Sequence, residues 1–164
     1  MRVLVVDDDA FVRVLLCLDL PEAELLEVTR VHEAVEVFAR REPLDALIVD
    51  LRLADGDGLE VVRQARSREW TRNLPIVVLT ADSDADAKAI YKAGADFYLV
   101  KPFVAAEVLA AIATVEKLEP VERRKRRHRL AKGVEVVEIF AAPLLAQPEP
   151  GTLRRFWRKD APTP

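Results

Sequence analysis

The sequence predicts an α/β domain with a doubly wound parallel β-sheet, and three observations support this prediction. Over residues 1–119, five short apolar runs alternate with segments that carry a helical spacing of apolar residues. Several of the runs are almost continuous Val, Ile and Leu, as in central parallel strands that are buried on both faces. Right-handed crossovers between such strands place helices on both sides of the sheet.

The expected strands are short and separated by helical segments. The first, third and fourth are the most apolar, and the second has the most mixed composition. The strands are expected at Arg2–Val6, Leu25–Thr29, Ala46–Asp50, Ile76–Thr80 and Phe97–Val100.

Five segments carry helical patterns. In the first, Phe11, Val14, Leu15 and Leu18 share one face of a helix. Gly94 is expected to close the fourth, because glycine readily adopts the left-handed conformation that ends a helix. The helices are expected at Ala10–Asp19, His32–Arg41, Leu59–Ser67, Ala85–Ala93 and Ala105–Leu118.

The composition is typical of a globular protein, with 51% hydrophobic and 32% charged residues in a chain of 164. No apolar run approaches the length of a membrane span. The N-terminus MRVLVVDDD is too short and too acidic to resemble a signal peptide. Cys17 is the only cysteine, which excludes an intrachain disulfide. We therefore expect a cytoplasmic protein that does not contact a membrane.

The net charge of −3 conceals two segments of opposite charge. Residues 1–119 carry 14 Lys and Arg against 23 Asp and Glu, a net charge of −9. Residues 120–164 carry 11 against 5, a net charge of +6. Pro120 marks the expected boundary, because proline is favoured in the first turn of a helix. We therefore divide the chain into a domain at 1–119 and a basic C-terminal extension at 120–164.

The extension begins with VERRKRRHRLAK, which is typical of a short basic helix that ends before Gly133. VEVVEIF at 134–140 fits a strand or a helix, residues 141–151 are rich in proline, and LRRFWRK at 153–159 is basic. The basic runs fit either contacts with nucleic-acid phosphates or a solvated face that interacts with the acidic domain, and we favour the second. A third interpretation is that the apolar runs pack on the domain or on a second copy.

Polar side chains follow four of the expected strands at the point where each strand ends. Asp7 and Asp8 follow the first, Asp50 ends the third, Thr80 ends the fourth and Lys101 follows the fifth. The carboxyl ends of parallel strands meet at one edge of a sheet, so these groups are expected to share a pocket. Clustered carboxylates favour a hard divalent cation, and the lysine favours a phosphoryl group.

These motifs together resemble the receiver domain of two-component response regulators. The resemblance covers residues 1 to about 119 and rests on VLVVDDD, LIVDLRLADGDGLE, PIVVLTA and GADFYLVKPF, in that order. It implies a flavodoxin-like (βα)5 fold with strand order 2-1-3-4-5. The chain departs from the family pattern at Ala54, where receivers usually carry proline, and the stretch from Thr80 to Lys101 is slightly shorter than usual.

The resemblance also implies roles for the acidic residues. Asp50 is the phospho-acceptor, since a carboxylate can attack phosphorus and form an acyl phosphate. The implied cofactor is Mg²⁺, with Asp7, Asp8, Asp50 and the backbone carbonyl of Arg52 as ligands. Asp9 is expected to cap the first helix and not to bind metal.

Three further residues acquire roles in the same way. Thr80 and Lys101 are implied to contact the phosphoryl group through a hydroxyl and an ammonium. Thr80 and Tyr98 form a switch, in which the hydroxyl moves toward the phosphate and the ring turns inward. The Lys101–Pro102 peptide bond is expected to be cis, as in a typical receiver.

The expected function is that of a response regulator that accepts a phosphoryl group on Asp50 from a histidine kinase or a histidine phosphotransfer protein. Its surface would then change, and a homodimer is an option by analogy with the family. The alternative is a transcriptional regulator that binds nucleic acid through its basic extension. We do not expect an enzyme that acts on external substrates, because the related phosphatases carry an acid where this chain has Arg52.

Overall fold

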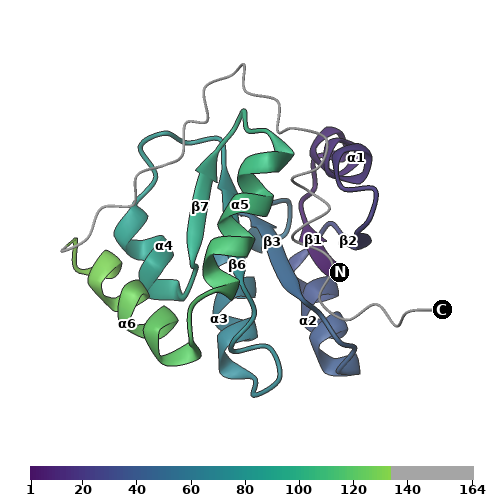
Figure 1. Cartoon of the computed structure of the whole chain (residues 1–164). Coiled ribbons are helices and arrows are strands. Elements are labelled where there is room, and N and C mark those ends of the chain that lie inside the picture. Colours follow the sequence, from purple (N-terminus) through teal and green to yellow (C-terminus); the bar gives the residue numbers. More distant parts are fainter. Residues whose placement is uncertain (134–164) are drawn as a thin grey trace.

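The computed structural model describes residues 1–133, and its centre is a parallel sheet of five strands in the order β2-β1-β3-β6-β7 (Figure 1). This is the predicted order 2-1-3-4-5, counted over the five long strands. Their bounds are β1 Arg2–Val6, β2 Glu24–Val28, β3 Ala46–Asp50, β6 Ile76–Thr80 and β7 Phe97–Val100. Every neighbouring pair in this sheet is parallel, so all carboxyl ends lie at one edge.

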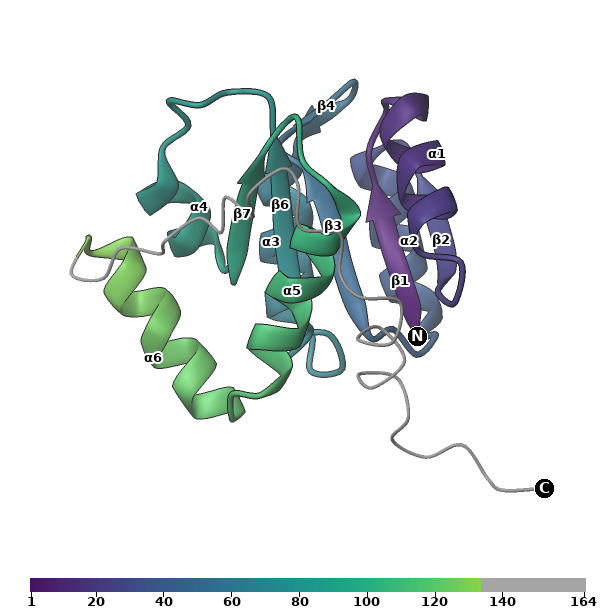
Figure 2. The ribbon, with the colours of Figure 1, turned by 45° about the horizontal axis from the view of Figure 1, so that its top comes forward.

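Helices cover both faces of the sheet, as Figures 1 and 2 show. One face packs against α1 (Ala10–Asp19) and α5 (Ala105–Glu116), and the other packs against α2 (Val31–Arg40), α3 (Gly58–Ser67) and α4 (Ala87–Ala93). Successive strand residues point to opposite faces, so each central strand contributes to both cores. This explains why the central strands read as unbroken apolar runs.

The predicted element bounds differ from the structure by one or two residues at several ends. The largest shifts are two residues: α5 ends at Glu116 and not at Leu118, and α4 begins at Ala87 and not at Ala85. The side chain of Asp86 accepts a hydrogen bond from the backbone N–H of Ala89 at 3.1 Å and so caps the helix. Gly94 closes α4 in the left-handed conformation, as predicted.

Of the apolar face predicted for the first helix, only Leu15 packs against the core. Phe11 and Leu18 are each 73% exposed, and Val14 is 55% exposed. Helix α1 carries a second apolar stripe, with Val12 and Leu16, and this stripe is buried in the core that α5 shares. Both stripes have helical spacing, so periodicity alone does not decide which of them faces inward.

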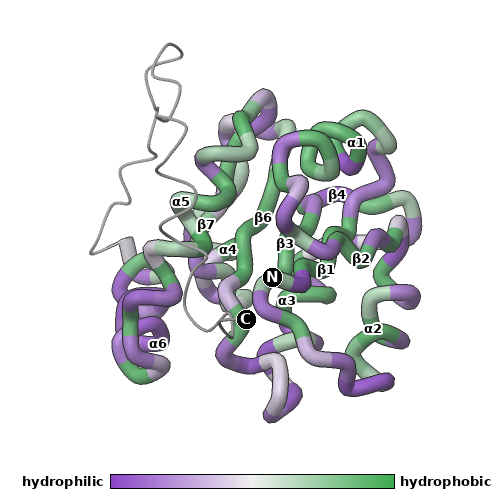
Figure 3. The backbone as a smooth tube through the Cα atoms, turned by 45° about the vertical axis from the view of Figure 1, so that its right-hand side comes forward, coloured by the Kyte–Doolittle hydropathy of each residue, from purple (hydrophilic) through white to green (hydrophobic). Residues whose placement is uncertain are grey.

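The predicted basic helix is present as α6 (Pro120–Ala131), which begins with proline and is followed by Gly133. It packs against α4 at the edge of the molecule, and Figure 3 shows it as a mainly hydrophilic helix. Leu130 is its one buried side chain. The segments expected at 134–140, 141–151 and 153–159 lie outside the described residues.

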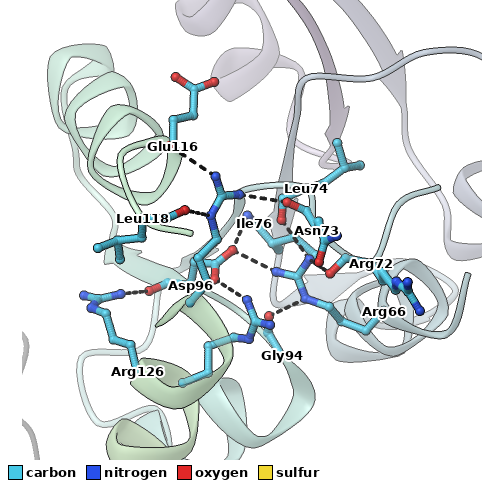
Figure 4. Close-up of polar contacts among 12 residues, drawn as sticks. Arg66, Arg72, Asn73, Leu74, Ile76, Gly94, Asp96, Glu116, Leu118 and Arg126 are labelled. Carbon is cyan, nitrogen blue, oxygen red and sulfur yellow. Dashed lines mark hydrogen bonds and ion pairs between the residues drawn. The ribbon is translucent and has the colours of Figure 1, made fainter. Parts of the chain in front are cut away.

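A buried carboxylate, Asp96, holds α6 in place (Figure 4). It lies directly before β7, is 1% exposed, and pairs with Arg127 of α6 at 2.6 Å and with Arg66 of α3 at 2.8 Å. It also accepts a hydrogen bond from the backbone N–H of Ile76 at 2.9 Å. Arg126 donates to the backbone carbonyl of Asp96 at 2.8 Å. No pattern in the sequence indicates this network.

A transmembrane helix needs about 20 consecutive, mostly apolar residues. Within residues 1–133, no helix combines the length and the apolar composition that a transmembrane span requires.

We predict that Gly58→Ala lowers the free energy of unfolding by about 2–4 kcal/mol, because it introduces steric strain. A Cβ at this first residue of α3 would lie 1.8 Å from the backbone carbonyl oxygen of Asp50, so the helix or the strand end must move. The matched control is Gly56→Ala, whose Cβ would meet only the flexible Val31 side chain at 3.4 Å. Urea unfolding measures both changes, and equal effects would contradict the prediction.

Candidate functional site

The carboxyl edge of the sheet brings together the acidic residues that the sequence singled out. Asp7 and Asp8 follow β1, and Asp50 is the last residue of β3. These strands are neighbours, with Val6 level with Val49. One carboxylate oxygen from each of the three acids lies within 4.8 Å of the others. The prediction that these acids lie close together is therefore confirmed.

Asp7 forms the buried floor of the cluster and is 0% exposed. Its Oδ1 accepts a hydrogen bond from the backbone N–H of Asp9 at 2.8 Å, and its Oδ2 accepts one from Lys101 Nζ at 3.0 Å. Burial raises the pKa of Asp7, although these hydrogen bonds act in the opposite direction. Burial therefore disfavours the charged form of Asp7, and the contact with Lys101 favours it.

Asp50 lies beside Asp7 but retains contact with solvent, at 8% exposure. Its Oδ1 accepts a hydrogen bond from the backbone N–H of Arg52 at 3.1 Å, and its Oδ2 contacts Lys101 Nζ. Asp8 is exposed at the rim of the cluster. An incoming group can therefore reach the acids from the solvent side.

Lys101 links the two buried acids. Its ammonium contacts both Asp7 and Asp50. Burial lowers the pKa of Lys101, but the hydrogen bonds and charges of the two carboxylates outweigh this effect, and the pKa is raised overall. The backbone N–H of Lys101 donates to the carbonyl of Thr80 at 2.7 Å, and the Lys101–Pro102 bond is cis, as predicted.

Thr80 ends β6 level with Val100 of β7, and its side chain is buried at the same edge. Its hydroxyl oxygen accepts a hydrogen bond from the backbone N–H of Asp82 at 3.0 Å, and so holds the start of the loop that leads to α4. Among residues 1–133, no hydrogen bond joins this hydroxyl to Asp50.

Tyr98 lies on β7 and is partly buried. Its ring meets the ring of Tyr91 of α4 edge to face, with centroids 5.9 Å apart and an interplanar angle of 67°. The predicted switch residue therefore contacts the helix that follows the Thr80 loop.

The loop after Asp50 contains a feature that the sequence analysis missed. Two short antiparallel strands, β4 (Arg52–Leu53) and β5 (Gly56–Asp57), form a hairpin around Ala54 and Asp55. The Asp-Gly pair in this segment was recognisable as a turn signal, but the strands are too short to show a pattern. Asp9 caps α1, as expected, through a hydrogen bond from the backbone N–H of Phe11 at 2.8 Å.

A known protein family and several curated proteins match this chain. The family described as "Response regulator receiver domain" matches residues 3–113. A similar curated protein is the response regulator MprA of Mycobacterium leprae, 45% identical over 73% of this chain and 53% of its own length. Another is the transcriptional regulatory protein PhoP of Escherichia coli, 36% identical over 86% of this chain and 68% of its own length.

Solved structures give the same result for the fold. A putative response regulator from Chloroflexus aurantiacus is 35% identical, with a TM-score of 0.64 over 70% of this chain and 95% of that one. The receiver domain of the sensor histidine kinase PA1611 from Pseudomonas aeruginosa, solved with a magnesium ion in its active site cleft, is 29% identical, with a TM-score of 0.63 over 71% and 98%. The chain spans about half the length of the first curated relatives it matches.

We predict that Asp7→Asn stabilises the metal-free protein near neutral pH. Because the pKa of Asp7 is raised, the folded state favours the protonated form of this side chain. Stability is therefore lost as the pH rises from 3.8, the ordinary pKa of an aspartate, through the pKa of Asp7 in the folded protein. An uncharged Asn avoids this loss, and its advantage over the native protein should shrink toward zero as pH falls below the ordinary value.

Urea unfolding in EDTA across this pH range tests the prediction. Asp9→Asn is the control, because it removes a neighbouring exposed carboxylate while Asn still caps α1. Its effect should stay within about 0.5 kcal/mol. A loss of stability in Asp7→Asn at neutral pH would contradict the expected sign.

Proposed function

This chain belongs to the response regulator receiver domain family of two-component systems, and we propose that it accepts a phosphoryl group on Asp50. The observation that supports this role is the placement of Asp50 at a solvent-accessible strand end, in contact with Lys101 and beside two further acids. We also propose the division into a receiver at 1–119 and an extension at 120–164, with α6 as the packed start of the extension.

The proposed reaction is a transfer between a donor and the Asp50 carboxylate. An oxygen of Asp50 attacks phosphorus and forms a P–O bond, while the P–N bond of a donor phosphohistidine breaks and its electron pair stays on the imidazole nitrogen. The product is an acyl phosphate. Hydrolysis of this product would regenerate Asp50, so the only chemistry that we propose takes place on the protein itself.

We propose two roles for Lys101, one before the transfer and one after it. Before transfer it balances the charges of Asp7 and Asp50, which it contacts. After transfer its ammonium can bind a phosphoryl oxygen, because the ammonium is a compact charge on a flexible stem. It supplies charge at the point where negative charge accumulates on the phosphoryl oxygens.

The donor set also fits Mg²⁺, which we propose as the cofactor. Asp7, Asp8 and Asp50 offer three carboxylates of suitable spacing, and the backbone carbonyl of Arg52 is the proposed fourth ligand. When bound, the ion would supply positive charge that offsets the repulsion between the acids and the phosphoryl oxygens. The magnesium ion in the PA1611 receiver supports this assignment.

We further propose that Thr80 and Tyr98 report the modification. The Thr80 hydroxyl oxygen accepts a hydrogen bond from the backbone N–H of Asp82 in this structure, and its O–H would be drawn toward a phosphoryl oxygen on Asp50 as a donor. Movement of Thr80 would alter the loop before α4, and Tyr98 contacts Tyr91 of α4. Electrostatics at Asp50 would thereby bias the position of a packed helix.

A protein donor is supported by the exposed apolar face of α1. Phe11, Val14 and Leu18 are large side chains exposed to solvent, and Phe11 lies close in sequence to Asp7 and Asp8. Contiguous apolar surface of this kind is typical of protein contact sites. We propose a histidine kinase or a histidine phosphotransfer protein as the donor.

The alternative, a nucleic-acid regulator acting through the extension, keeps some support from the PhoP relative, a transcriptional regulatory protein. Against it, Arg123, Arg126 and Arg127 of α6 are used in contacts with the receiver. This observation fits a packed basic helix better than a free nucleic-acid arm. The homodimer and the cytoplasmic location expected from the sequence remain predictions.

We predict that acetyl phosphate with Mg²⁺ adds one phosphoryl group to the native chain, as measured by intact-protein mass spectrometry. Asp50→Asn should abolish the addition, because the amide is a poor nucleophile. Asp57→Asn is the matched control, since it replaces an exposed aspartate whose capping hydrogen bond to Leu59 an Asn can also make. Phosphorylation that persists in Asp50→Asn would overturn the assignment.

We predict that Mg²⁺ raises the Tm of the native protein, because binding to the folded state alone is stabilising. Asp8→Asn should weaken Mg²⁺ binding by at least about tenfold, since it removes one of only three carboxylate ligands. Asp9→Asn should retain the native response, because Asp9 caps α1 and does not belong to the cluster. Calorimetric titration measures the affinities, and an unchanged affinity in Asp8→Asn would exclude this ligand set.

A further inference from the structure

A groove of about 510 Å³ lies at the end of the sheet opposite Asp50. It is bordered by the end of α3, the loop before β6, the end of α4 and the start of α6. Among the described residues, its lining contains no carboxylate and five cationic side chains: Arg66, Arg72, Lys92, Arg124 and Arg127. The groove is therefore cationic, although the chain as a whole has a net charge of −3.

Two of the five cations share one counter-ion. Arg66 pairs with the buried Asp96 at 2.8 Å (Figure 4), and Arg127 pairs with it at 2.6 Å. One carboxylate therefore faces two guanidinium groups, and a positive charge remains uncompensated at the base of the groove. Burial lowers the pKa of Arg66 to about 10, so it is still protonated at neutral pH.

The other three cations form no ion pair within the described part of the chain. The side chains of Arg72, Lys92 and Arg124 make no hydrogen bond or ion pair with any of residues 1–133. They come from a loop, from the last turn of α4 and from the first turns of α6. The groove thus collects cations from three separate elements, and it exists because α6 packs beside α4.

Pro120 and Val121 at the start of α6 also line the groove. Pro120 has no N–H group, and α6 carries Glu119 at its N-cap and Glu122 in its first turn. The cationic side chains, and not the helix end, therefore supply the positive potential of the groove.

We propose that this groove binds a compact polyphosphate anion, such as the triphosphate group of a nucleotide. Its volume is within the range of small-molecule sites, which is roughly 300–1,000 Å³. Arg72, Lys92 and Arg124 around the concavity match several adjacent phosphate groups. The groove lies at the amino ends of β6 and β7, so its ligand does not contact the Asp50 site.

The test is calorimetric titration of the full chain with inorganic tripolyphosphate and with ATP, in EDTA so that the acidic cluster holds no metal. Lys92→Gln/Arg124→Gln should weaken binding by at least about tenfold, because two charge-assisted contacts are lost. The matched control is Lys88→Gln/Lys132→Gln. It removes the same number of charges at α4 and the end of α6, from residues outside the groove lining, and should retain the native affinity within about threefold. Asp50→Asn should bind as the native chain does.

Three outcomes would overturn the proposal. The first is a native chain that binds neither polyphosphate, and the second is an equal loss in the groove variant and its control, which would indicate a diffuse charge effect. The third comes from a parallel titration with a short DNA duplex. Duplex binding that depends on Lys92 and Arg124, without binding of the free polyphosphates, would assign the groove to a nucleic-acid backbone. Failure here leaves the acetyl phosphate result on Asp50 unaffected.

Discussion

The contact of one ammonium with two buried carboxylates is the constraint on which the functional edge depends. Asp7 and Asp50 end adjacent strands, and like charges at this spacing repel strongly when water is excluded. Lys101 compensates them from β7, which lies two places beyond β3 in the sheet. In this strand order the lysine reaches across the mouth of the sheet from the far side of β6.

The residues at this edge could be predicted from the sequence because each of them directly follows a recognisable strand. A run such as ALIV followed by Asp50 identifies both a buried strand and the polar group at its end, and parallel topology then aligns all such ends. Periodicity failed for α1, where two apolar stripes compete and only packing against α5 selects Val12 and Leu16. The contacts of Asp96 could not be predicted from the sequence, for a different reason. Its partner Arg127 lies 31 positions away, and no short-range pattern encodes the pair.

The buried aspartates Asp50 and Asp96 use different cations, and the difference fits their roles. Asp96 pairs with guanidinium groups, whose fixed fork holds several acceptors at once, and Arg66 also donates to the carbonyls of Gly94, Arg72 and Leu74. Such a network resists rearrangement. Asp50 contacts the point charge of Lys101 instead. An ammonium on a flexible stem can exchange one oxygen partner for another, as phosphoryl transfer requires.

The direction of α6 has a geometric consequence for anything joined to its end. Arg123 near its start contacts the carbonyl of Asn73, before β6, whereas Gly133 beyond its end lies near Lys88 in the first turn of α4. The helix therefore runs antiparallel to α4 and returns the polypeptide from the amino side of the sheet toward the carboxyl side. A segment joined after Gly133 therefore begins on the half of the molecule that carries Asp50. A domain fused at this point would start on the same side of the sheet as the Asp50 site.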